Sequence, residues 1–403
     1  MNPLRAHWTL DPEVRFLNHG SFGACPKSVL ALQQELRARI EREPVLFLAR
    51  ELEQRLDEVR AVLAPFLGAA AEDIVPVANA TTGVNAVLRS LDFRPGDEIL
   101  LTNQGYNACR NTAEFVAART GARVVVAPVP FPLRSPEEVL EAVFAAVTPR
   151  TALALLDHVT SPTGLVFPIE GLVRGLGERG VETLVDGAHA PGMLPLDLGA
   201  LAPAYYTGNL HKWVCAPKGA AFLYVRRDLQ RTIHPPVLSH GTNSPRTDRA
   251  RFRLEFDFTG TDDPTAFLCV PECLSFLGGL FPGGWEELRR RNRELVLRGR
   301  ALLCEALRTP APAPESMIGS LAAVPLPQGS PSPRPDAFAI DPLQRALFEQ
   351  HRIEVPVFPW PAPPRRLVRI SAQAYNEPAE YEVLAAALRS AQPGTPGSSL
   401  API

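Results

Sequence analysis

The sequence predicts an α/β fold in which a large domain with a mostly parallel sheet is joined to a smaller α+β domain. Three observations lead to this prediction. The chain has 403 residues, more than one hydrophobic core usually supports. Short apolar runs alternate with amphipathic segments between residues 74 and 185, and the character of the sequence changes at residue 309. Two lobes of different architecture account for all three observations.

The composition excludes several classes of protein. Hydrophobic residues make up 46% and charged residues 21% of the chain, as in ordinary globular proteins, so disorder cannot describe the whole of it. The 41 Lys and Arg residues balance 43 Asp and Glu residues without a basic block, which excludes a nucleic-acid surface. No apolar run approaches the ~20 residues that span a bilayer, and the first 25 residues do not form a signal peptide. We therefore expect a cytoplasmic protein without nucleic-acid or membrane partners.

The first expected elements are amphipathic helices over residues 28–67, where apolar residues recur every three to four positions, with an interruption near Pro44. Alternating elements follow from residue 74. Helices are expected at residues 81–91, 108–119, 136–147 and 169–179, and strands at residues 97–102, 122–127, 151–156, 181–185 and 220–225. Strands rich in Val, Leu and Ile between helices of about ten residues are typical of a parallel sheet covered on both faces.

The smaller lobe is expected in the C-terminal part of the chain. We place the large domain at residues 16–285 and the small domain at residues 286–391, together with residues 1–15. A long helix at 285–307 is followed by a loop with eight prolines at 309–335, which surrounds one short strand at 320–324. The remaining expected elements are a helix at 342–351, strands at 353–358 and 366–371, a helix at 377–391 and a frayed tail at 392–403.

Polar residues follow the predicted strands, at the edge of the sheet where open α/β folds bind ligands. They are Thr81, Thr82, Tyr106, Asn107, residues 158–163, Asp186, His189 and residues 208–212. Asp186 comes directly after an apolar strand, so its carboxylate needs a cationic or hydrogen-bonding partner, and a protonated ring nitrogen would supply one. The alternative role for Asp186 is a cap for the turn at residues 187–192.

Lysine occurs only at Lys27, Lys212 and Lys218. Lys212 lies beside Trp213, where an amine would lose solvation and have a lowered pKa, as a Schiff-base lysine requires. The other two lysines adjoin prolines in expected loops, and a plain surface lysine is the alternative for Lys212. The six cysteines show no CxxC pair and no metal-ligand spacing, so we expect buried free thiols and no metal site.

Thr81 and Thr82 open a predicted helix, where free backbone N–H groups attract phosphate. A simple helix cap is the alternative for these two threonines. Arg369 alternates with the apolar residues Val368 and Ile370 in its predicted strand, so its side chain points away from the face that they bury. For Arg365 and Arg366 beside it, the alternative is that they are solvated surface charges.

Four motifs together have a recognisable arrangement. They are DGAH at 186–189, NLHK at 209–212, ATT at 80–82 and LVRISAQAYN at 367–376. This set resembles the class V, fold-type I pyridoxal-phosphate enzymes over about residues 16–390. Within that class, the segments at 17–26, 158–164, 208–213 and 258–268 resemble the isopenicillin N epimerase branch.

The resemblance implies pyridoxal 5′-phosphate as the cofactor and a role for each matching residue. Lys212 would form a Schiff base with it and carry the α proton of the substrate, while Asp186 would pair with the pyridine nitrogen. His189, a third catalytic residue, and Thr160 would lie near the ring hydroxyl, and Tyr106 would cover the ring face.

The same resemblance implies contacts for the phosphate and the substrate. The phosphate would be bound by Thr81, Thr82, Asn209, His211 and, from the neighbouring subunit, Thr261. This last contact implies a homodimer. Arg369 would hold the carboxylate of the substrate, and Asn18 would belong to an N-terminal loop that closes over it.

Two departures from the family pattern bear on the reaction. Asp262 stands where the epimerase branch commonly has an Arg, which changes the charge beside Thr261. No cysteine follows Cys304, so a desulfurase with a thiol relay is not expected. The predicted function is an isopenicillin N epimerase-like enzyme that acts on an amino acid or amino-acid-like substrate. The alternatives are a C–S lyase, a class V aminotransferase and, more remotely, a non-catalytic binding protein.

Overall fold

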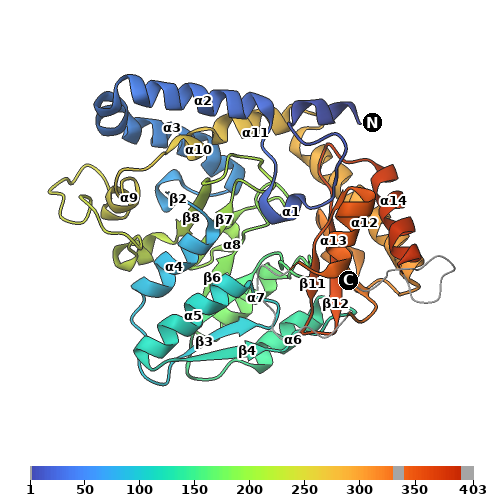
Figure 1. Ribbon diagram of the computed structural model, residues 1–403. Helices are drawn as coiled ribbons and strands as arrows, with labels where there is room; N and C mark the ends of the chain where they lie inside the picture. Colours follow the sequence, from blue (N-terminus) through green and yellow to red (C-terminus); the bar gives the residue numbers. More distant parts are fainter. Residues whose placement is uncertain (1, 330–339, 392–403) are drawn as a thin grey trace.

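The structure is a computed structural model, and it describes residues 2–329 and 340–391 (Figure 1). Its main sheet has seven strands in the order β2-β8-β7-β6-β5-β3-β4. The strands are β2 (Ile74–Val77), β3 (Glu98–Thr102), β4 (Arg123–Ala127), β5 (Thr151–Asp157), β6 (Glu182–Asp186), β7 (Tyr205–Asn209) and β8 (Ala221–Val225). Only β8 runs against its neighbours β7 and β2 within this sheet. The predicted mostly parallel sheet is confirmed.

Helices cover both faces of this sheet. On one face α4 (Ala80–Ser90) and α5 (Asn107–Thr120) share a core cluster with Leu153 and Leu155 of β5. On the other face α6 (Glu137–Ala145), α7 (Ile169–Gly177) and α3 (Leu52–Leu67) share a cluster with Ala154 and Leu156 of the same strand. The two sets of apolar residues alternate along β5 because successive side chains of a strand point to opposite faces.

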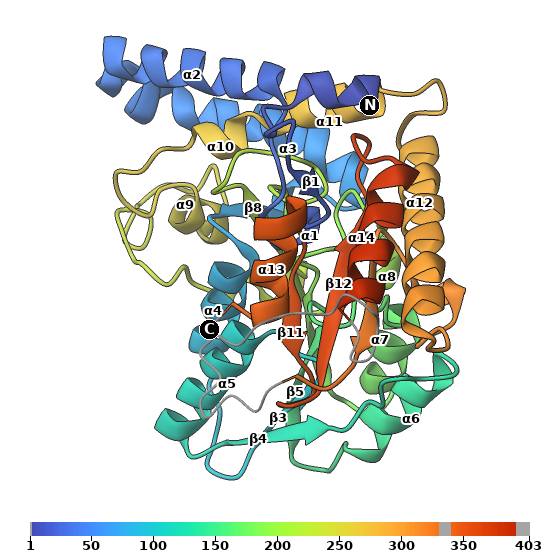
Figure 2. The same ribbon diagram turned by 45° about the vertical axis from the view of Figure 1, so that its right-hand side comes forward.

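A second, antiparallel sheet has the order β11-β12-β9 and is built from β9 (Leu321–Leu326), β11 (Val357–Pro359) and β12 (Arg366–Ser371). The helices α12 (Gly284–Leu307) and α14 (Pro378–Ser390) pack against each other beside it, and α13 (Pro342–His351) contacts α14 and the strand that follows α13 in the chain (Figure 2). The expected strand at 353–358 is two strands, β10 (Ile353–Glu354) and β11, which belong to different sheets. Pro356 lies between them, and it has no N–H to donate to a continuous ladder.

The N-terminal residues lie against the C-terminal part of the chain. A 3₁₀ helix spans Pro3–His7, and β1 (Arg15–Phe16) pairs in parallel with β10. The Nδ2 of Asn2 donates to the backbone oxygens of Ala374 and Asn376 at 2.8 and 3.0 Å. These contacts agree with grouping residues 1–15 with the C-terminal lobe, although the division into domains stays a prediction.

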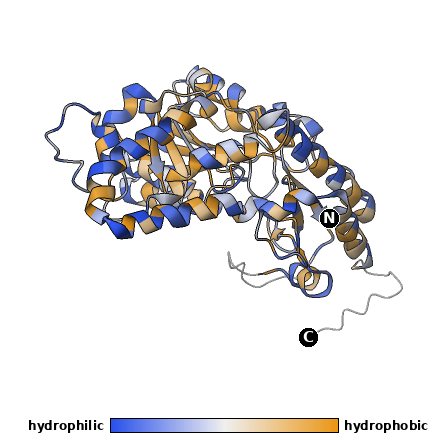
Figure 3. Cartoon of the chain, turned by 90° about the horizontal axis from the view of Figure 1, so that it is seen from above, coloured by the Kyte–Doolittle hydropathy of each residue, from blue (hydrophilic) through white to orange (hydrophobic). Residues whose placement is uncertain are grey.

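The N-terminal helices cross one end of the main sheet. They are α1 (His19–Phe22), α2 (Lys27–Arg42) and α3, with a π-helical segment Leu46–Glu51 after the predicted interruption at Pro44. Seen from above, these helices carry hydrophilic residues outward and apolar residues toward the core (Figure 3). The remaining helices are α8 (Leu198–Leu201), α9 (Arg251–Phe256), α10 (Thr265–Leu268) and α11 (Val270–Gly278), with 3₁₀ turns at Ala71–Asp73, Arg227–Thr232 and Glu315–Met317.

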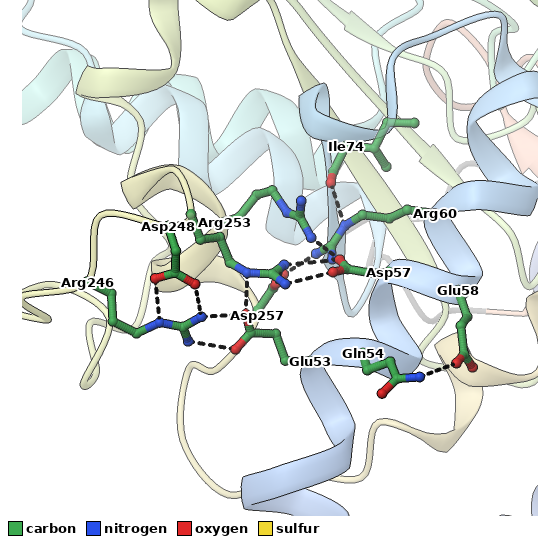
Figure 4. A network of polar contacts seen from close by, with 11 residues as sticks. Glu53, Gln54, Asp57, Glu58, Arg60, Ile74, Arg246, Asp248, Arg253 and Asp257 are labelled. Carbon is green, nitrogen blue, oxygen red and sulfur yellow. Dashed lines mark hydrogen bonds and ion pairs between the residues drawn. The ribbon is translucent and has the colours of Figure 1, made fainter.

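A network of ion pairs joins α3 to the segment that contains α9 (Figure 4). Arg60 is fully buried, and its guanidinium donates to Asp57 at 2.9 Å, to Asp257 and to the backbone oxygen of Ile74. Arg249 donates to both oxygens of Asp57. The network therefore fixes the chain directly before residues 258–264.

Three further findings concern the expectations from sequence. In the described ranges, no helix is long and apolar enough to cross a membrane, and no group of three or more His, Cys, Asp or Glu side chains is placed to hold a metal ion. All six cysteines are free thiols, five of them buried. The predicted tail at 392–403 and residues 330–339 of the proline-rich loop lie outside the described residues, and the expected cytoplasmic location stays a prediction.

Candidate functional site

The candidate site lies at the carboxyl ends of the parallel strands. Asp157 is the last residue of β5, Asp186 of β6 and Asn209 of β7. Asp157 and Asp186 are directly opposite each other in the register of these two strands. Lys212 follows in the loop between β7 and β8. The position just past each strand end therefore brings together residues that are far apart in the sequence.

Lys212 contacts His189 within the site. Its Nζ lies 3.1 Å from the Nε2 of His189. Desolvation, with the charge of Arg369 as a second cause, lowers the pKa of Lys212 to about 8. An amine with this pKa is partly neutral near neutral pH and can act as a nucleophile or as a base.

Asp186 is a buried carboxylate that accepts hydrogen bonds from uncharged groups. The thiol of Cys109 donates to its Oδ2 at 3.1 Å, and the backbone N–H of Ala188 donates to its Oδ1 at 3.0 Å. Within residues 2–329 and 340–391 no cationic side chain forms an ion pair with it. A protonated ring nitrogen would satisfy this carboxylate, so the residues fit a pyridine-type cofactor at this place.

A second carboxyl group lies beside Asp186. Burial, together with the charge of Asp186, raises the pKa of Asp157 well above its usual value. Asp157 is therefore easier to protonate than an exposed aspartate, and it lies directly opposite Asp186 in the sheet. The backbone N–H of Tyr106 donates to Asp157, and this places Tyr106 at the start of α5, with 46% of its surface exposed.

The beginning of α4 lies against the end of β7. The Oδ1 of Asn79 caps the helix by accepting from the backbone N–H of Thr82 at 2.9 Å. Asn209 accepts from the backbone N–H of Ala80 at 2.8 Å. Thr81, Thr82 and Asn209 are thus brought together at a helix N-terminus, which is a suitable place for a phosphate group.

His211 and Thr160 have local partners. The Nδ1 of His211 donates to the backbone oxygen of Ala220 at 3.3 Å, and burial lowers the pKa of its imidazole to about 4. The hydroxyl of Thr160 accepts from the backbone N–H of Leu165 at 2.9 Å and contacts the hydroxyl of Thr163 at 2.6 Å. The hydroxyl of Thr160 is used to close the turn after β5. Of the two residues predicted to lie near the ring hydroxyl, His189 is the one whose Nε2 lies beside the Nζ of Lys212.

Arg369 is the arginine of β12 that reaches the site. It is 2% exposed, and its guanidinium donates to the backbone oxygen of Ser161 and, at 3.1 Å, to the hydroxyl of Ser21. Burial lowers the pKa of Arg369 to about 10 because the charged guanidinium has lost its solvation. Arg366 instead pairs with Asp341 at 2.7 Å, and Arg365 is exposed. A buried guanidinium without a carboxylate is suited to bind the carboxylate of a ligand.

The N-terminal segment reaches Arg369 through Ser21. The hydroxyl of Ser21 donates to the Oδ1 of Asn18 at 2.6 Å, and the Nδ2 of Asn18 donates to Glu354 at 3.1 Å. Asn18 is therefore linked to Arg369 by one intervening hydroxyl group. Sequence reasoning identified Asn18 and missed Ser21, although both belong to the segment 17–26.

His19 joins the same segment to the Lys212 loop. Its Nε2 donates to the backbone oxygen of Lys212 at 2.9 Å, and its Nδ1 lies 2.8 Å from the hydroxyl of Tyr375. The chain at Gly23 approaches the loop so closely that a Cβ there would lie 2.0 Å from the backbone oxygen of His211. With φ at +68°, Gly23 also has a backbone conformation that other residues rarely adopt.

Thr261 is the predicted site residue that the structure does not bring to Lys212. It is exposed, and its neighbour Asp263 forms an ion pair with Arg37 at 2.8 Å. A cavity of about 190 Å³ lies beside it and is lined by Thr82 and Gly260 among others. The segment is therefore close to the start of α4 but leaves the hydroxyl of Thr261 on the surface of this chain.

Comparisons with known proteins identify the family and the fold of this chain. The aminotransferase class-V family matches residues 23–278. The chain is 39% identical over 399 residues to isopenicillin N epimerase of Amycolatopsis lactamdurans, covering 96% of this chain and 97% of that protein. It is 33% identical to the probable chloroplastic L-cysteine desulfhydrase of Arabidopsis thaliana, covering 93% and 82%. A solved cystine C–S lyase in complex with cysteine persulfide shares the fold at a TM-score of 0.76 and 23% identity, over 96% of this chain and 99% of that one.

Proposed function

The chain belongs to the aminotransferase class-V family, and on this basis we propose that it is a pyridoxal-phosphate enzyme, isopenicillin N epimerase-like, that acts on an amino acid or amino-acid-like substrate. One observation carries the proposal. Asp186, Lys212 and Arg369 are brought to one site, and no ion pair joins any of them to another described residue. Asp186 is thus available for a positively charged ring nitrogen, Lys212 for an electrophilic carbonyl group and Arg369 for a carboxylate.

Pyridoxal 5′-phosphate is the cofactor that these residues fit. Lys212 would hold it covalently, Asp186 would hold the ring nitrogen, and the start of α4 would hold the phosphate. When bound, the cofactor supplies an electron-withdrawing ring that stabilises negative charge at the α carbon of the substrate.

The residues of this chain have separate tasks in that reaction. Arg369 binds the carboxylate of the substrate and so orients the bond at its α carbon. Lys212, when its amine is neutral, would accept the α proton. Cys109 and the backbone N–H of Ala188 donate to the carboxylate of Asp186 and fix its position, where it would hold the ring nitrogen. His189 donates or accepts a hydrogen bond beside Lys212.

Epimerisation is the reaction that we favour, because the identity to isopenicillin N epimerase of Amycolatopsis lactamdurans is 39% over nearly the full length of both chains. A β-eliminating C–S lyase is the second candidate, favoured by the 33% identity to the Arabidopsis desulfhydrase. Transamination remains the third. The three reactions start from the same loss of the α proton. In epimerisation a proton returns to the α carbon, in β-elimination the sulfur group leaves, and in transamination the amino group is transferred.

The experiment uses one panel of amino acids and related peptides with the cofactor-loaded enzyme. Exchange of the α hydrogen with deuterated solvent and loss of optical purity would indicate epimerisation. Release of pyruvate and sulfide from cysteine would indicate the lyase, and conversion of an added keto acid would indicate the transaminase. Lys212→Ala should abolish every one of these signals and the visible absorption band of the cofactor. Lys27→Ala, at an exposed position, is the matched control and should retain them.

We also propose that the active unit is a homodimer. Thr261 is exposed in this chain, and Val237, which lines the cavity beside Gly260, is 59% exposed. A second copy that covers this surface would bury the apolar side chain and bring Thr261 to the partner's phosphate. Light scattering of the loaded enzyme should give twice the mass of the chain, and a fully active monomer would contradict the proposal.

A further inference from the structure

His189 lies between two residues that are adjacent in the sequence. Its Nε2 is 3.1 Å from the Nζ of Lys212, and its Nδ1 is 3.4 Å from the indole Nε1 of Trp213. His189 is 2% exposed and Trp213 is 1% exposed, so water does not compete for the contact between these two side chains. The two ring nitrogens of His189 therefore face two chemically different partners.

The contact with Trp213 decides which ring nitrogen carries the hydrogen. An indole N–H can donate a hydrogen bond and cannot accept one. If Nδ1 of His189 also carried a hydrogen, two N–H groups would point at each other across 3.4 Å and repel. The contact is longer than the usual 2.7–3.2 Å of such bonds, so its main effect is to exclude a hydrogen from Nδ1.

His189 is neutral at neutral pH. Burial is the largest cause that lowers its pKa well below the usual value, and the basic groups Lys212, Arg369, His211 and His19 around it act in the same direction. A neutral imidazole has one ring hydrogen. Nδ1 faces the indole N–H, while Nε2 faces the Nζ of Lys212, which donates as an ammonium group and can accept once it is neutral. Above the Lys212 pKa of about 8, the ring hydrogen therefore lies on Nε2.

We propose that Trp213 fixes His189 in the tautomer with its hydrogen on Nε2, so that His189 presents a hydrogen-bond donor to whatever occupies the position beside Lys212. In the cofactor-free protein above about pH 8, that acceptor is the lone pair of the neutral Lys212 amine. In the loaded enzyme it would be an oxygen of the cofactor or substrate, and this second part rests on the proposed function. Trp213 is thus a positioning residue that acts through His189.

The surroundings of Trp213 hold its indole in place. Its ring packs against the imidazole of His19 with a centroid distance of 5.0 Å. A Cβ at Gly192 would lie 2.6 Å from the backbone carbonyl carbon of Trp213, so the chain is packed closely there as well. A tryptophan held on both sides cannot turn its N–H away from His189 without displacing these neighbours.

The test is nitrogen-15 NMR of the cofactor-free protein with labelled histidine rings. His189 is assigned by the resonances that disappear in His189→Asn. In the wild type, at a pH above the Lys212 pKa of about 8, we expect Nε2 at a chemical shift typical of a protonated nitrogen and Nδ1 at one typical of an unprotonated nitrogen. In Trp213→Phe, which removes the N–H donor together with part of the buried ring, we expect the two shifts to move toward each other as both tautomers become populated.

Tyr375→Phe is the matched control, because Tyr375 contacts Nδ1 of His19 and not His189. It should move the resonances of His19 and leave those of His189 in place. A wild-type His189 with its hydrogen on Nδ1 would overturn the proposal, even if Trp213→Phe fails to fold. It would also be overturned if Trp213→Phe left the His189 resonances unchanged, or if Tyr375→Phe moved them equally. Because the measurement needs no cofactor, a protein that shows the expected tautomer but forms no visible band with pyridoxal phosphate would contradict the proposed function alone.

Discussion

The molecule contains two regions of buried charge that are built differently. At α3, Arg60 is fully buried and forms ion pairs with Asp57 and Asp257 (Figure 4). At the carboxyl ends of the strands, Arg369 is nearly as deeply buried, but its hydrogen-bond partners are the hydroxyl of Ser21 and atoms of Ser161. Both guanidinium groups are shielded from water, but only that of Arg60 forms ion pairs with carboxylates.

This difference separates a structural role from a functional one. A buried charge without a counter-charge reduces the stability of the folded protein, so it persists where a ligand later supplies the missing charge. The effect is visible in the acid–base properties, since burial lowers the pKa of Arg369 to about 10. The α3 network should therefore govern stability and the strand-end site should govern activity, and variants in each region test this division.

The largest effect is expected at Asp186. Asp186→Asn should retain the fold and still bind the cofactor, but lose about 10²- to 10³-fold in kcat/KM, because an amide cannot keep a ring nitrogen protonated. Steady-state kinetics with the best substrate of the panel measure this loss. Asp57→Asn in the α3 network is the control and should reduce the denaturation midpoint while kcat stays close to that of the wild type. Near-normal turnover of Asp186→Asn would show that Asp186 is only a cap of the following turn.

The second effect concerns the α3 network. Arg60→Met should lower the free energy of unfolding by about 3 kcal/mol, the lower end for a broken buried pair, because Asp57 and Asp257 keep Arg249 as a partner. Urea denaturation monitored by circular dichroism measures it, with Arg290→Met at an exposed helical pair as the control. A variant with unchanged stability but lower kcat would contradict the division between the two regions.

The third effect is expected at Arg369. Arg369→Lys should raise KM by about 5- to 150-fold, a loss of about 1–3 kcal/mol, since a lysine keeps the charge and loses the planar pair of donors. The dissociation constant of the cofactor should change little. Arg366→Lys is the control on the same strand, where the partner is Asp341. If Arg366→Lys raises KM and Arg369→Lys does not, the carboxylate of the substrate is bound by the other arginine.

The smallest effect is a dependence on pH that comes from Lys212. Its pKa is lowered from 10.5 to about 8 in the cofactor-free protein. The rate of covalent cofactor attachment, followed by its absorption band, should therefore rise with a midpoint near pH 8, because the neutral amine is the reactive form. A midpoint above pH 10 would show that burial does not depress the pKa.

The Lys212 amine should also make the free energy of unfolding depend on pH. Between about pH 8 and pH 10.5 the unfolded chain binds the Lys212 proton and the folded chain does not, so the free energy of unfolding should increase as the pH rises through this range. Lys212→Met should remove this increase, which denaturation at several pH values would measure.

Much of the fold could be predicted because the local pattern of apolar residues reflects which faces of a strand or helix are buried. The strand at β5 was expected since both of its faces are apolar, and this requires helices on both sides. β7 was not expected, because Tyr205–Asn209 ends in polar residues, and its Thr207 hydroxyl is satisfied only by the backbone oxygen of Phe222 on the next strand. Its position, and the reversed direction of β8, depend on pairing that no single segment contains.

The site shows the same limit. Asp186 and Lys212 could be predicted from the rule that ligands bind past the strand ends, and the structure brings both to that edge. Asp157 could not be recognised as the neighbour of Asp186, because their proximity depends on the register of β5 and β6. Ser21 could not be recognised as a partner of Arg369, from which it is separated by 348 residues.

The parallel pair β1–β10 and the contact of His19 with Tyr375 have a consequence for the order in which the protein matures on the ribosome. His19 and Tyr375 are 356 positions apart, so at translation rates of 5–20 residues per second the first waits about 20–70 s for the second. During this time every strand of the main sheet has been synthesised, yet the segment that supports the backbone of Lys212 lacks its C-terminal partners. A nascent chain could thus complete its main sheet well before the backbone of Lys212 is held in place, and chains that stop short of residue 353 would lack the contacts of Tyr375 and β10 with the N-terminal segment.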